Sequence, residues 1–254
     1  MAKVYFLGTG TSSGVPQMGC TCRVCTSDDV RDKRTRTSVI LETDTGKRFL
    51  FDCGPDFRTQ FLRMPFSHLD AIFLTHEHYD HVGGLEDLRP HSTFGDVRVY
   101  ADAVCAHHLK KRLSYIFRED KYPGIAQLDL QVVDAAHSYE IAGMTVQPIE
   151  VMHGRLPILG YRVGDFAYIT DMSKIEDKEK VKLKGVKLLI INALRQYDHH
   201  SHQTLQQALD LIQEIRPEVC YLVHMSHQMG LHAEVEETLP SGVHLANDGL
   251  EVTF

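Results

Sequence analysis

A histidine-rich heptapeptide, Thr75–His81, restricts most strongly what this chain can fold into. It follows an apolar run over 71–74 that is typical of a buried strand, and it precedes 82–88, which we expect to form a helix opened by glycine. Three imidazoles and the carboxylate of Asp80 therefore lie on the turn between a strand and a helix. Because ligands collect at the carboxyl ends of strands in α/β sheets, the heptapeptide predicts a sheet with a binding site at its edge.

The spacing inside the heptapeptide indicates a site for two metal ions. His76 and His78 are two residues apart, so their rings point to the same side of an extended segment. Asp80 and His81 lie beyond the bend, where they can face a second ion. Neutral imidazole and carboxylate oxygen suit zinc, manganese and iron. A solvated loop with several histidines is the alternative, and the strand ends described next weigh against it.

Five apolar runs of the chain end in a residue of the metal-binding type. These terminal residues are Asp52, His76, His153, Asp171 and His224. A single polar residue at a strand end means little, but five of this type are hard to obtain by chance. We therefore expect residues far apart in the sequence to converge at one edge of the fold.

A separate cluster of three thiols, Cys20, Cys22 and Cys25, predicts a second kind of metal site. Thiols this close together in a reduced protein most often bind zinc, which takes four ligands in structural sites. The fourth ligand must come from elsewhere in the sequence, and His227 is our candidate. A closed set of four ligands leaves no position for substrate, so we expect a structural zinc. The alternative is three free thiols on a loop.

Composition narrows the class of protein. The chain has 254 residues, of which 43% are apolar and 24% charged, and it shows no linker or repeat, so we expect one globular domain over 1–254. Its net charge of −7 argues against a nucleic-acid partner. No run suits a signal peptide or a membrane span, which predicts a cytoplasmic protein without a membrane partner. Whether the chain forms a homodimer is left open.

The remaining sequence alternates short apolar runs with turns. The segment 8–16 is rich in glycine but lacks the Gly-Lys-Ser/Thr ending of a phosphate loop, so we interpret it as a plain turn. Lys121-Tyr122-Pro123-Gly124 is expected to break the chain. We expect helices over 103–115, 175–183, 205–215 and 234–239, and strands over 3–7, 38–42, 48–51, 71–74, 97–100, 128–133, 145–151, 159–163, 166–169, 187–191, 219–223, 243–245 and 250–252.

The pattern His-x-His-x-Asp-His after a strand resembles the signature of the metallo-β-lactamase superfamily. This resemblance implies an α/β fold, a four-layer αββα sandwich with metals at the sheet edge. It implies that Asp171 bridges two divalent ions, and it places Asp52 where a carboxylate orients a metal-bound histidine, although Asp52 can equally be a turn residue. The implied ligands are His76, His78 and His153 for one ion and Asp80, His81 and His224 for the other.

Several motifs together resemble the narrower group of PhnP-type cyclic phosphodiesterases. These are the Gly-Thr-Gly-Thr-Ser turn before the cysteines, the segment Gly84–Pro90, a histidine before the helix Thr-Leu-Gln-Gln-Ala-Leu, and His-Met-Ser-His at 224–227. The resemblance implies a structural zinc on the three cysteines and His227. It also implies acid catalysis by His202. Because His199 and His200 lie close by, His200 is the second candidate for the acid.

We expect a hydroxide between two zinc or manganese ions to attack a small phosphodiester, while His202 donates a proton to the leaving alkoxide. Asp80 counts among the catalytic residues as well as the metal ligands. The narrower resemblance implies a cyclic ribose phosphate as substrate. Arg89 and Arg155 lie near the metal loops, where each can steer phosphate or form a surface ion pair.

Three other functions remain open on the sequence. A tRNase Z-like RNA-processing endonuclease shares the metal motifs, but it needs a basic surface to bind RNA. This chain is acidic and has no long Gly- or Lys-rich insertion. A lactone or thioester hydrolase uses the same metals. A metal-binding protein without catalysis is the third, and complete ligand sets with an added histidine weigh against it.

Overall fold

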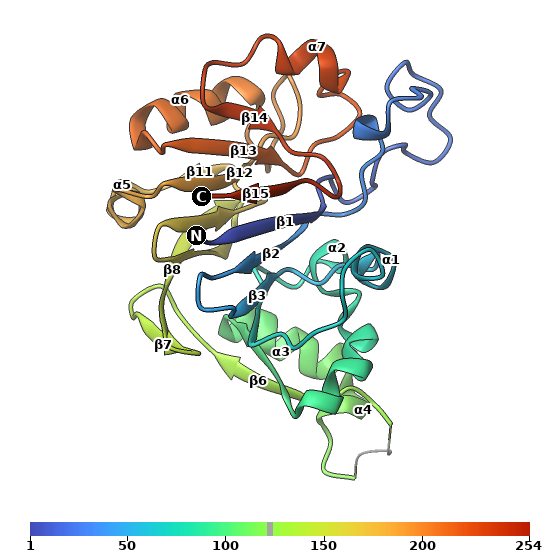
Figure 1. Ribbon diagram of the computed structural model, residues 1–254, viewed down its shortest axis with the longest axis vertical. Coiled ribbons are helices and arrows are strands. Elements are labelled where there is room, and N and C mark those ends of the chain that lie inside the picture. Colours follow the sequence, from blue (N-terminus) through green and yellow to red (C-terminus); the bar gives the residue numbers. More distant parts are fainter. Residues whose placement is uncertain (121–123) are drawn as a thin grey trace.

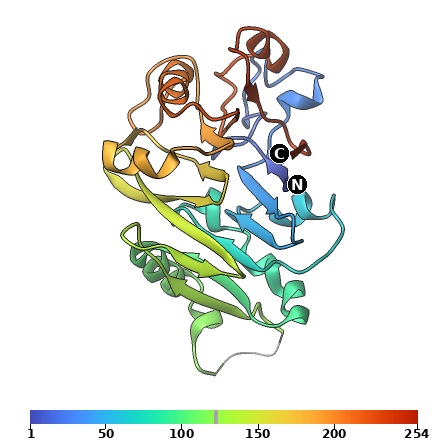
Figure 2. The same cartoon turned by 60° about the vertical axis from the view of Figure 1, so that its left-hand side comes forward.

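Two mixed sheets lie face to face, with helices on both outer faces, in a computed structural model that describes residues 1–120 and 124–254. Figures 1 and 2 show α1–α4 over one sheet and α5–α7 over the other. The helices are α1 (Phe57–Phe61), α2 (Tyr79–Val82), α3 (Ala103–Arg112), α4 (Ser114–Phe117), α5 (Asp177–Lys180), α6 (Leu205–Ile215) and α7 (His232–Glu236), with 3-10 turns η1 (Val30–Asp32), η2 (Leu85–Phe94) and η3 (Val181–Leu183).

The first sheet has the order β15-β1-β2-β3-β4-β5-β6. Its strands from β15 to β3 pair antiparallel and those from β3 to β6 pair parallel. The two ends of the chain meet here, because Lys3 pairs with Thr253 (Figure 1). The strands are β1 (Lys3–Gly8), β2 (Ser38–Glu42), β3 (Arg48–Phe51), β4 (Ala71–Phe73), β5 (Val97–Ala101), β6 (Leu128–Val132) and β15 (Glu251–Thr253).

The second sheet has the order β11-β8-β9-β10-β12-β13-β14, and β7 pairs with β8 outside this path. Its β10, β12, β13 and β14 run parallel, so their carboxyl ends reach the same edge. The strands are β7 (Tyr139–Ile141), β8 (Met144–His153), β9 (Leu156–Val163), β10 (Phe166–Ile169), β11 (Lys174–Ile175), β12 (Leu188–Asn192), β13 (Val219–Val223) and β14 (Val243–Leu245).

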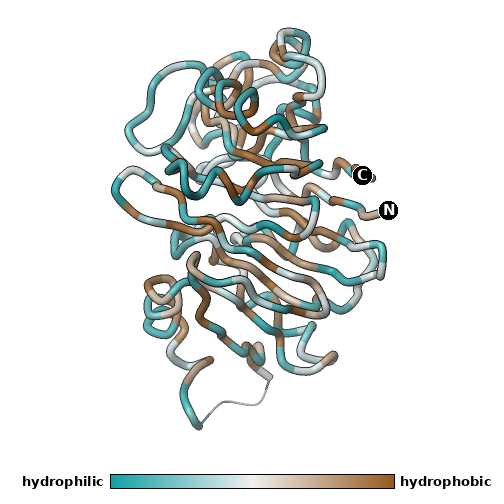
Figure 3. The backbone as a smooth tube through the Cα atoms, turned by 90° about the vertical axis from the view of Figure 1, so that its left-hand side faces the viewer, coloured by the Kyte–Doolittle hydropathy of each residue, from teal (hydrophilic) through white to brown (hydrophobic). Residues whose placement is uncertain are grey.

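An aromatic core holds the two sheets together. The ring of Phe51 in the first sheet lies 5.2 Å from that of Phe166 and 5.4 Å from that of Tyr168 in the second. Two further apolar clusters lie between each sheet and its helices. Figure 3 shows the apolar colouring concentrated on the central strands. Burial on both faces of both sheets gives the four-layer αββα sandwich, which confirms the predicted fold class.

Several elements match the sequence prediction, and others differ for identifiable reasons. The strands at 38–42, 48–51, 166–169, 219–223 and 243–245 are confirmed. The helix expected over 103–115 breaks at Leu113, which leaves α3 and α4. The single helix expected over 175–183 is wrong, because its first residue pairs with β8 in β11 and the rest divides into α5 and η3. The break expected at 121–124 lies, apart from Gly124, outside the described residues.

The glycine pair after the heptapeptide precedes the 3-10 helix η2, with Gly84 at its N-cap, so the helix expected over 82–88 begins at Leu85. The helix α2 already begins at Tyr79, and Gly83 and Gly84 separate it from η2. A Cβ atom at Gly84 would lie 2.1 Å from the carbonyl oxygen of Gly54, so only glycine allows this close approach. This close approach places the end of the heptapeptide segment against the loop that follows β3.

No helix in the described part of the chain has the length and hydropathy to cross a bilayer.

Candidate metal centre and active site

The five strand-end residues meet at one edge shared by the two sheets. Asp52 and His76 follow β3 and β4 of the first sheet. His153 ends β8, and Asp171 and His224 follow β10 and β13 of the second sheet. The edge is therefore built from both sheets, as the strand ends in the sequence predicted.

The backbone turns sharply at three of these positions. The φ angles of Asp52, Asp171 and His224 are 59°, 58° and 56°, in the left-handed region that costs a non-glycine residue free energy. Only Ala142 and Arg216 share this property among the non-glycine residues that the structure describes. Strained backbone of this kind concentrates at functional sites. Here it directs carboxylate and imidazole groups inward immediately after a strand.

Three histidines form the first group of potential ligands. The Nε2 atom of His76 lies 2.9 Å from Nδ1 of His78, and the ligand atoms of these residues and of His153 all lie within 4.8 Å of one another. Burial lowers the pKa values of His76 and His78, so both rings favour the neutral form that binds metal. His76 is buried and His78 is exposed, so this group borders solvent.

Two carboxylates and two imidazoles form the second group, and it is buried. His81 Nε2 lies 3.1 Å from Asp80 Oδ2 and 3.3 Å from Asp171 Oδ1. His224 Nε2 lies 3.1 Å from Asp171 Oδ1 and 3.4 Å from Asp80 Oδ2. His81 Nε2 itself is a buried polar atom without a hydrogen bond. Nitrogen and oxygen atoms that converge in this way fit a divalent cation.

The charges in this second group also favour a cation. Burial alone lowers the pKa of His81, but the carboxylates of Asp171 and Asp80 outweigh it and raise that pKa well above its usual range. Burial alone raises the pKa of Asp171, but His224 and His81 outweigh it and hold that pKa far below its usual range. The buried carboxylates thus attract positive charge, which a metal ion can supply in place of a proton.

Asp171 lies between the two groups. One of its oxygens, Oδ1, faces His81 and His224, and the other, Oδ2, lies 3.8 Å from Nε2 of His76. The two oxygens therefore point toward different sets of imidazoles, as a bridging carboxylate requires.

Hydrogen bonds hold the far side of two of the imidazoles, those of His81 and His153. His81 Nδ1 donates to Asp52 Oδ2 at 2.8 Å, and His153 Nδ1 donates to the backbone oxygen of Ser201 at 2.9 Å. Asp52 also accepts from the backbone N–H of Thr75 and the hydroxyl of Tyr168, each at 2.9 Å. Such partners fix the ring and leave Nε2 free for a metal. Asp52 is thus more than a turn residue, because it orients His81.

Replacing Asp52 with asparagine should weaken metal binding without removing a ligand. The amide cannot offer two acceptor oxygens to Tyr168, Thr75 and His81 together, so His81 loses its fixed orientation. We expect the affinity of the buried ligand group that contains His81 for a divalent ion to fall by about 10–100-fold. Metal titration followed by calorimetry measures this change. Unchanged affinity would show that Asp52 serves the turn alone.

His199, His200 and His202, which precede α6, lie in different environments. The ring of His202 lies 4.6 Å from that of His153 and 5.0 Å from that of His224, one histidine from each group. Its Nδ1 atom is buried without a hydrogen bond. Burial, with the charge of His224, lowers the pKa of His202 to about 3, below the ordinary value assumed from sequence. His200 is exposed and stacks on His199 at 4.3 Å.

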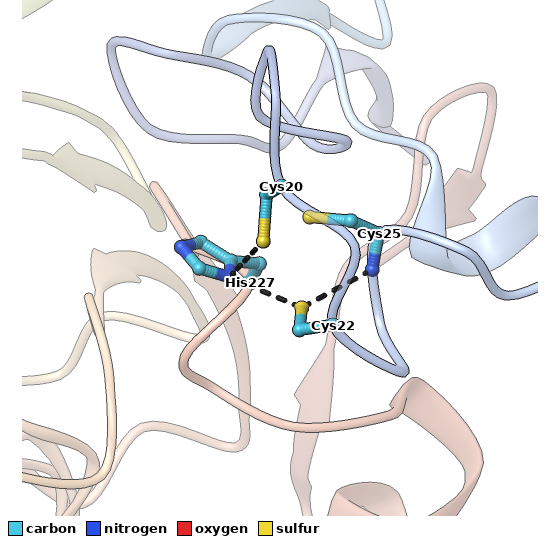
Figure 4. A group of neighbouring side chains, drawn as sticks. All are labelled: Cys20, Cys22, Cys25 and His227. Carbon is cyan, nitrogen blue, oxygen red and sulfur yellow. Dashed lines mark hydrogen bonds between the residues drawn. The ribbon is translucent and has the colours of Figure 1, made fainter.

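The cysteine cluster assembles as the sequence predicted. Figure 4 shows Cys20, Cys22 and Cys25 on one loop and His227 approaching from a distant segment. Sulfur atoms of Cys20 and Cys22 lie 3.5 Å and 3.2 Å from His227 Nδ1, and all four ligand atoms lie within 4.8 Å of one another. The backbone N–H of Cys25 lowers the pKa of Cys22 to about 6, which favours a thiolate. Three sulfurs and one nitrogen suit tetrahedral zinc.

The two arginines considered for phosphate steering lie in different places. Arg89 lines a hollow of about 420 Å³ with Phe57, Phe61 and His91, and no candidate metal ligand lines that hollow. Arg155 is exposed two residues after His153, in the turn between β8 and β9. Of these two arginines, only Arg155 lies within two residues of a candidate metal ligand, His153.

Comparisons with known proteins agree with this geometry. The family model of the β-lactamase superfamily domain matches residues 47–225. A solved structure described as a new diphosphatase from the PhnP family has 39% identity and a TM-score of 0.91, and the alignment covers 99% of this chain and 96% of that one. Human tRNase Z, short form, has 21% identity, a TM-score of 0.72 and coverage of 99% and 98%, which shows the fold alone.

A further relative extends beyond this chain. A Porphyromonas gingivalis protein named octanoyltransferase is 50% identical over 98% of this chain, but the match covers 51% of that protein. The chain thus spans about half the length of this relative. Together with the fold and the ligand geometry, the family match over most of the chain shows that it belongs to the metallo-β-lactamase superfamily, with a PhnP-family diphosphatase among its structural neighbours.

Proposed function

We propose that this protein hydrolyses a small phosphodiester at a dinuclear centre of zinc or manganese, with His202 as the proton donor to the leaving group. The observation that carries the proposal is the position of His202, between His153 of one ligand group and His224 of the other. Two divalent ions bound there would supply water activation at neutral pH and neutralise charge on phosphoryl oxygens.

Metal binding and proton donation would be carried out by different residues. His76, His78 and His153 would hold one ion, Asp80, His81 and His224 the other, and Asp171 would bridge them. His202 would stand over the bound diester and donate its proton as the ester bond breaks. Burial lowers the pKa of His202 in the free protein, whereas an anionic diester beside the ring favours the protonated form. The proton is therefore best held in the substrate complex.

Replacing His202 with alanine tests this proposal. We expect loss of about 10²–10⁴-fold in kcat for a diester with an alkoxide leaving group, because that group needs a proton as it departs. A bis(p-nitrophenyl) phosphate, whose leaving group is a weak base, should be cleaved at nearly the normal rate. Measuring both rates, and the metal content, separates acid catalysis from damage to the metal site.

His107→Ala is the matched control, because this exposed histidine lies on α3 and belongs to neither ligand group. Equal losses on both diesters in His202→Ala would contradict the acid role. A selective loss in His200→Ala instead would move that role to His200.

The PhnP-family neighbour favours a second substrate class. That protein is described as a diphosphatase, and hydrolysis of the phosphoanhydride in a diphosphate makes the same demand on the two metals, although its phosphate leaving group depends less on an acid than an alkoxide does. We propose a cyclic ribose phosphodiester first and a diphosphate second. Comparing kcat/KM on a cyclic phosphate, a linear diester, a diphosphate and a pre-tRNA orders these classes, and the net charge of −7 disfavours the RNA.

The relative named octanoyltransferase adds a carbonyl substrate to this comparison. Its matched half is similar to this chain, and its other half has no counterpart here. Hydrolysis of an octanoyl thioester faster than every phosphate substrate would replace our proposal with that of a thioester hydrolase. We also propose that residues 1–254 form a single domain, because one core joins strands from both halves of the chain.

A further inference from the structure

The loop that carries His202 is closed at its base by hydrogen bonds. It leaves β12 and enters α6, and here we call residues 194–203 the acid loop. The backbone N–H of Leu194 donates to the oxygen of Gln203 at 3.1 Å, and the side-chain amide of Gln203 donates to the oxygen of Asn192. His202 therefore directly precedes Gln203, whose hydrogen bonds close the loop. These bonds do not fix the outer part of the loop.

The first residues of the acid loop, 194–196, are tied to the segment 226–229. Arg195 donates from its guanidinium to Gln228 Oε1 at 2.9 Å, and Gln196 donates to the backbone oxygen of Met229 at 2.8 Å. Ser226 donates to the oxygen of Leu194 from both its N–H and its hydroxyl, each at 3.0 Å. The same segment contains His227 of the cysteine cluster. The two sites therefore share one short stretch of chain.

Arg195 makes more of these contacts than its neighbours. Besides Gln228, its guanidinium donates to the backbone oxygens of Tyr197 and Asp198, and it stacks over the ring of Tyr197 at 4.4 Å. No carboxylate of the described residues forms an ion pair with it. A planar group with several fixed donors suits this task, because it can hold two segments at once.

We propose that Arg195 is a positioning residue for His202: it fastens the acid loop to the segment that the cysteine cluster holds, and so sets where the proton is donated. This inference rests on the acid role of His202 proposed above. It also gives the cysteine cluster a part in the reaction, since the cluster anchors the segment to which the acid loop is tied.

Arg195→Met tests the inference by the choice of leaving group. A misplacement of about 1 Å can cost roughly 10²-fold in rate, so we expect about 10–100-fold lower kcat on a diester with an alkoxide leaving group. KM and the rate on bis(p-nitrophenyl) phosphate should change little. Arg195→Lys keeps the charge but not the planar group, and should recover only part of the loss.

Two further measurements exclude a general structural effect. Metal content per chain should be unchanged in Arg195→Met, and amide hydrogen exchange should accelerate within 196–202 only. Combined with His202→Ala, the arginine substitution should add no further loss, because the group that it positions is absent. Arg162→Met is the matched control, since this arginine also donates to backbone oxygens, those of Gly164, Lys182 and Lys184, outside the site.

The outcomes separate the two proposals. If His202→Ala slows both diesters equally, the acid role is wrong and Arg195 has nothing to position. If His202→Ala is selective but Arg195→Met is not, the acid role stands and the inference about Arg195 is overturned. Loss of metal from Arg195→Met, or an additive loss in the double variant, would also overturn it.

Discussion

Asp171→Ala is expected to lower kcat by about 10³–10⁴-fold and to reduce bound metal in the active site. Among the residues that the structure describes, Asp171 is the one carboxylate whose two oxygens face different ligand groups. Bound metal ions stabilise the transition state by several kcal/mol, and each 1.36 kcal/mol of activation free energy changes the rate about tenfold. Elemental analysis together with kcat on both leaving-group classes measures the effect.

Asp171→Ala should lower kcat equally for substrates with good and with poor leaving groups, whereas His202→Ala should lower it mainly for those with poor leaving groups. Asp165→Ala is the control, because this carboxylate lies on the same hairpin and pairs with Lys187 at the surface. Full metal content and near-normal turnover in Asp171→Ala would be incompatible with a bridged pair of ions.

Cys22→Ser is expected to give the largest loss of stability. Structural zinc contributes about 10–16 kcal/mol of apparent binding free energy in small zinc-binding peptides. A loss of only about 3 kcal/mol would lower the unfolding midpoint of a chain this long by roughly 6–12 °C. Differential scanning calorimetry with and without added zinc measures it, and added zinc should raise the midpoint of the unsubstituted protein more than that of Cys22→Ser, which keeps only the histidine and aspartate groups.

Cys105→Ala provides the comparison for that experiment, since it removes a buried thiol that belongs to no ligand group. Its midpoint should rise with added zinc as that of the unsubstituted protein does, because all four residues of the cysteine cluster remain. If Cys22→Ser and Cys105→Ala behave alike, the cysteine cluster is not a zinc site.

The strand ends were predictable because they depend on local pattern. An apolar run followed by Asp or His marks both a strand and its edge, so Asp52, His76, His153, Asp171 and His224 could be found from sequence alone. The shortest elements could not. The two-residue strand β11 exists only through its pairing with β8, and β7 has three residues. The break at Leu113 likewise has no signal in its own segment.

The choice between neighbouring histidines also required the structure. His199, His200 and His202 are chemically alike, and only the folded chain buries the third beside two ligand histidines while His200 is exposed. The partner of Arg195 in the other segment, Gln228, lies 33 residues away, so no local pattern could show it. Charge effects such as the lowered pKa of His202 arise from burial and have no counterpart in sequence.

The left-handed backbone at Asp52, Asp171 and His224 has a consequence for evolution and engineering. Glycine would adopt these angles at less cost, yet it would remove a carboxylate or an imidazole that the centre uses. Backbone conformation and side-chain contacts therefore favour different residues at the same three positions. Glycine there would relax the backbone but would remove the hydrogen bonds of Asp52 and groups that we propose for the reaction, so selection for turnover must act there continuously.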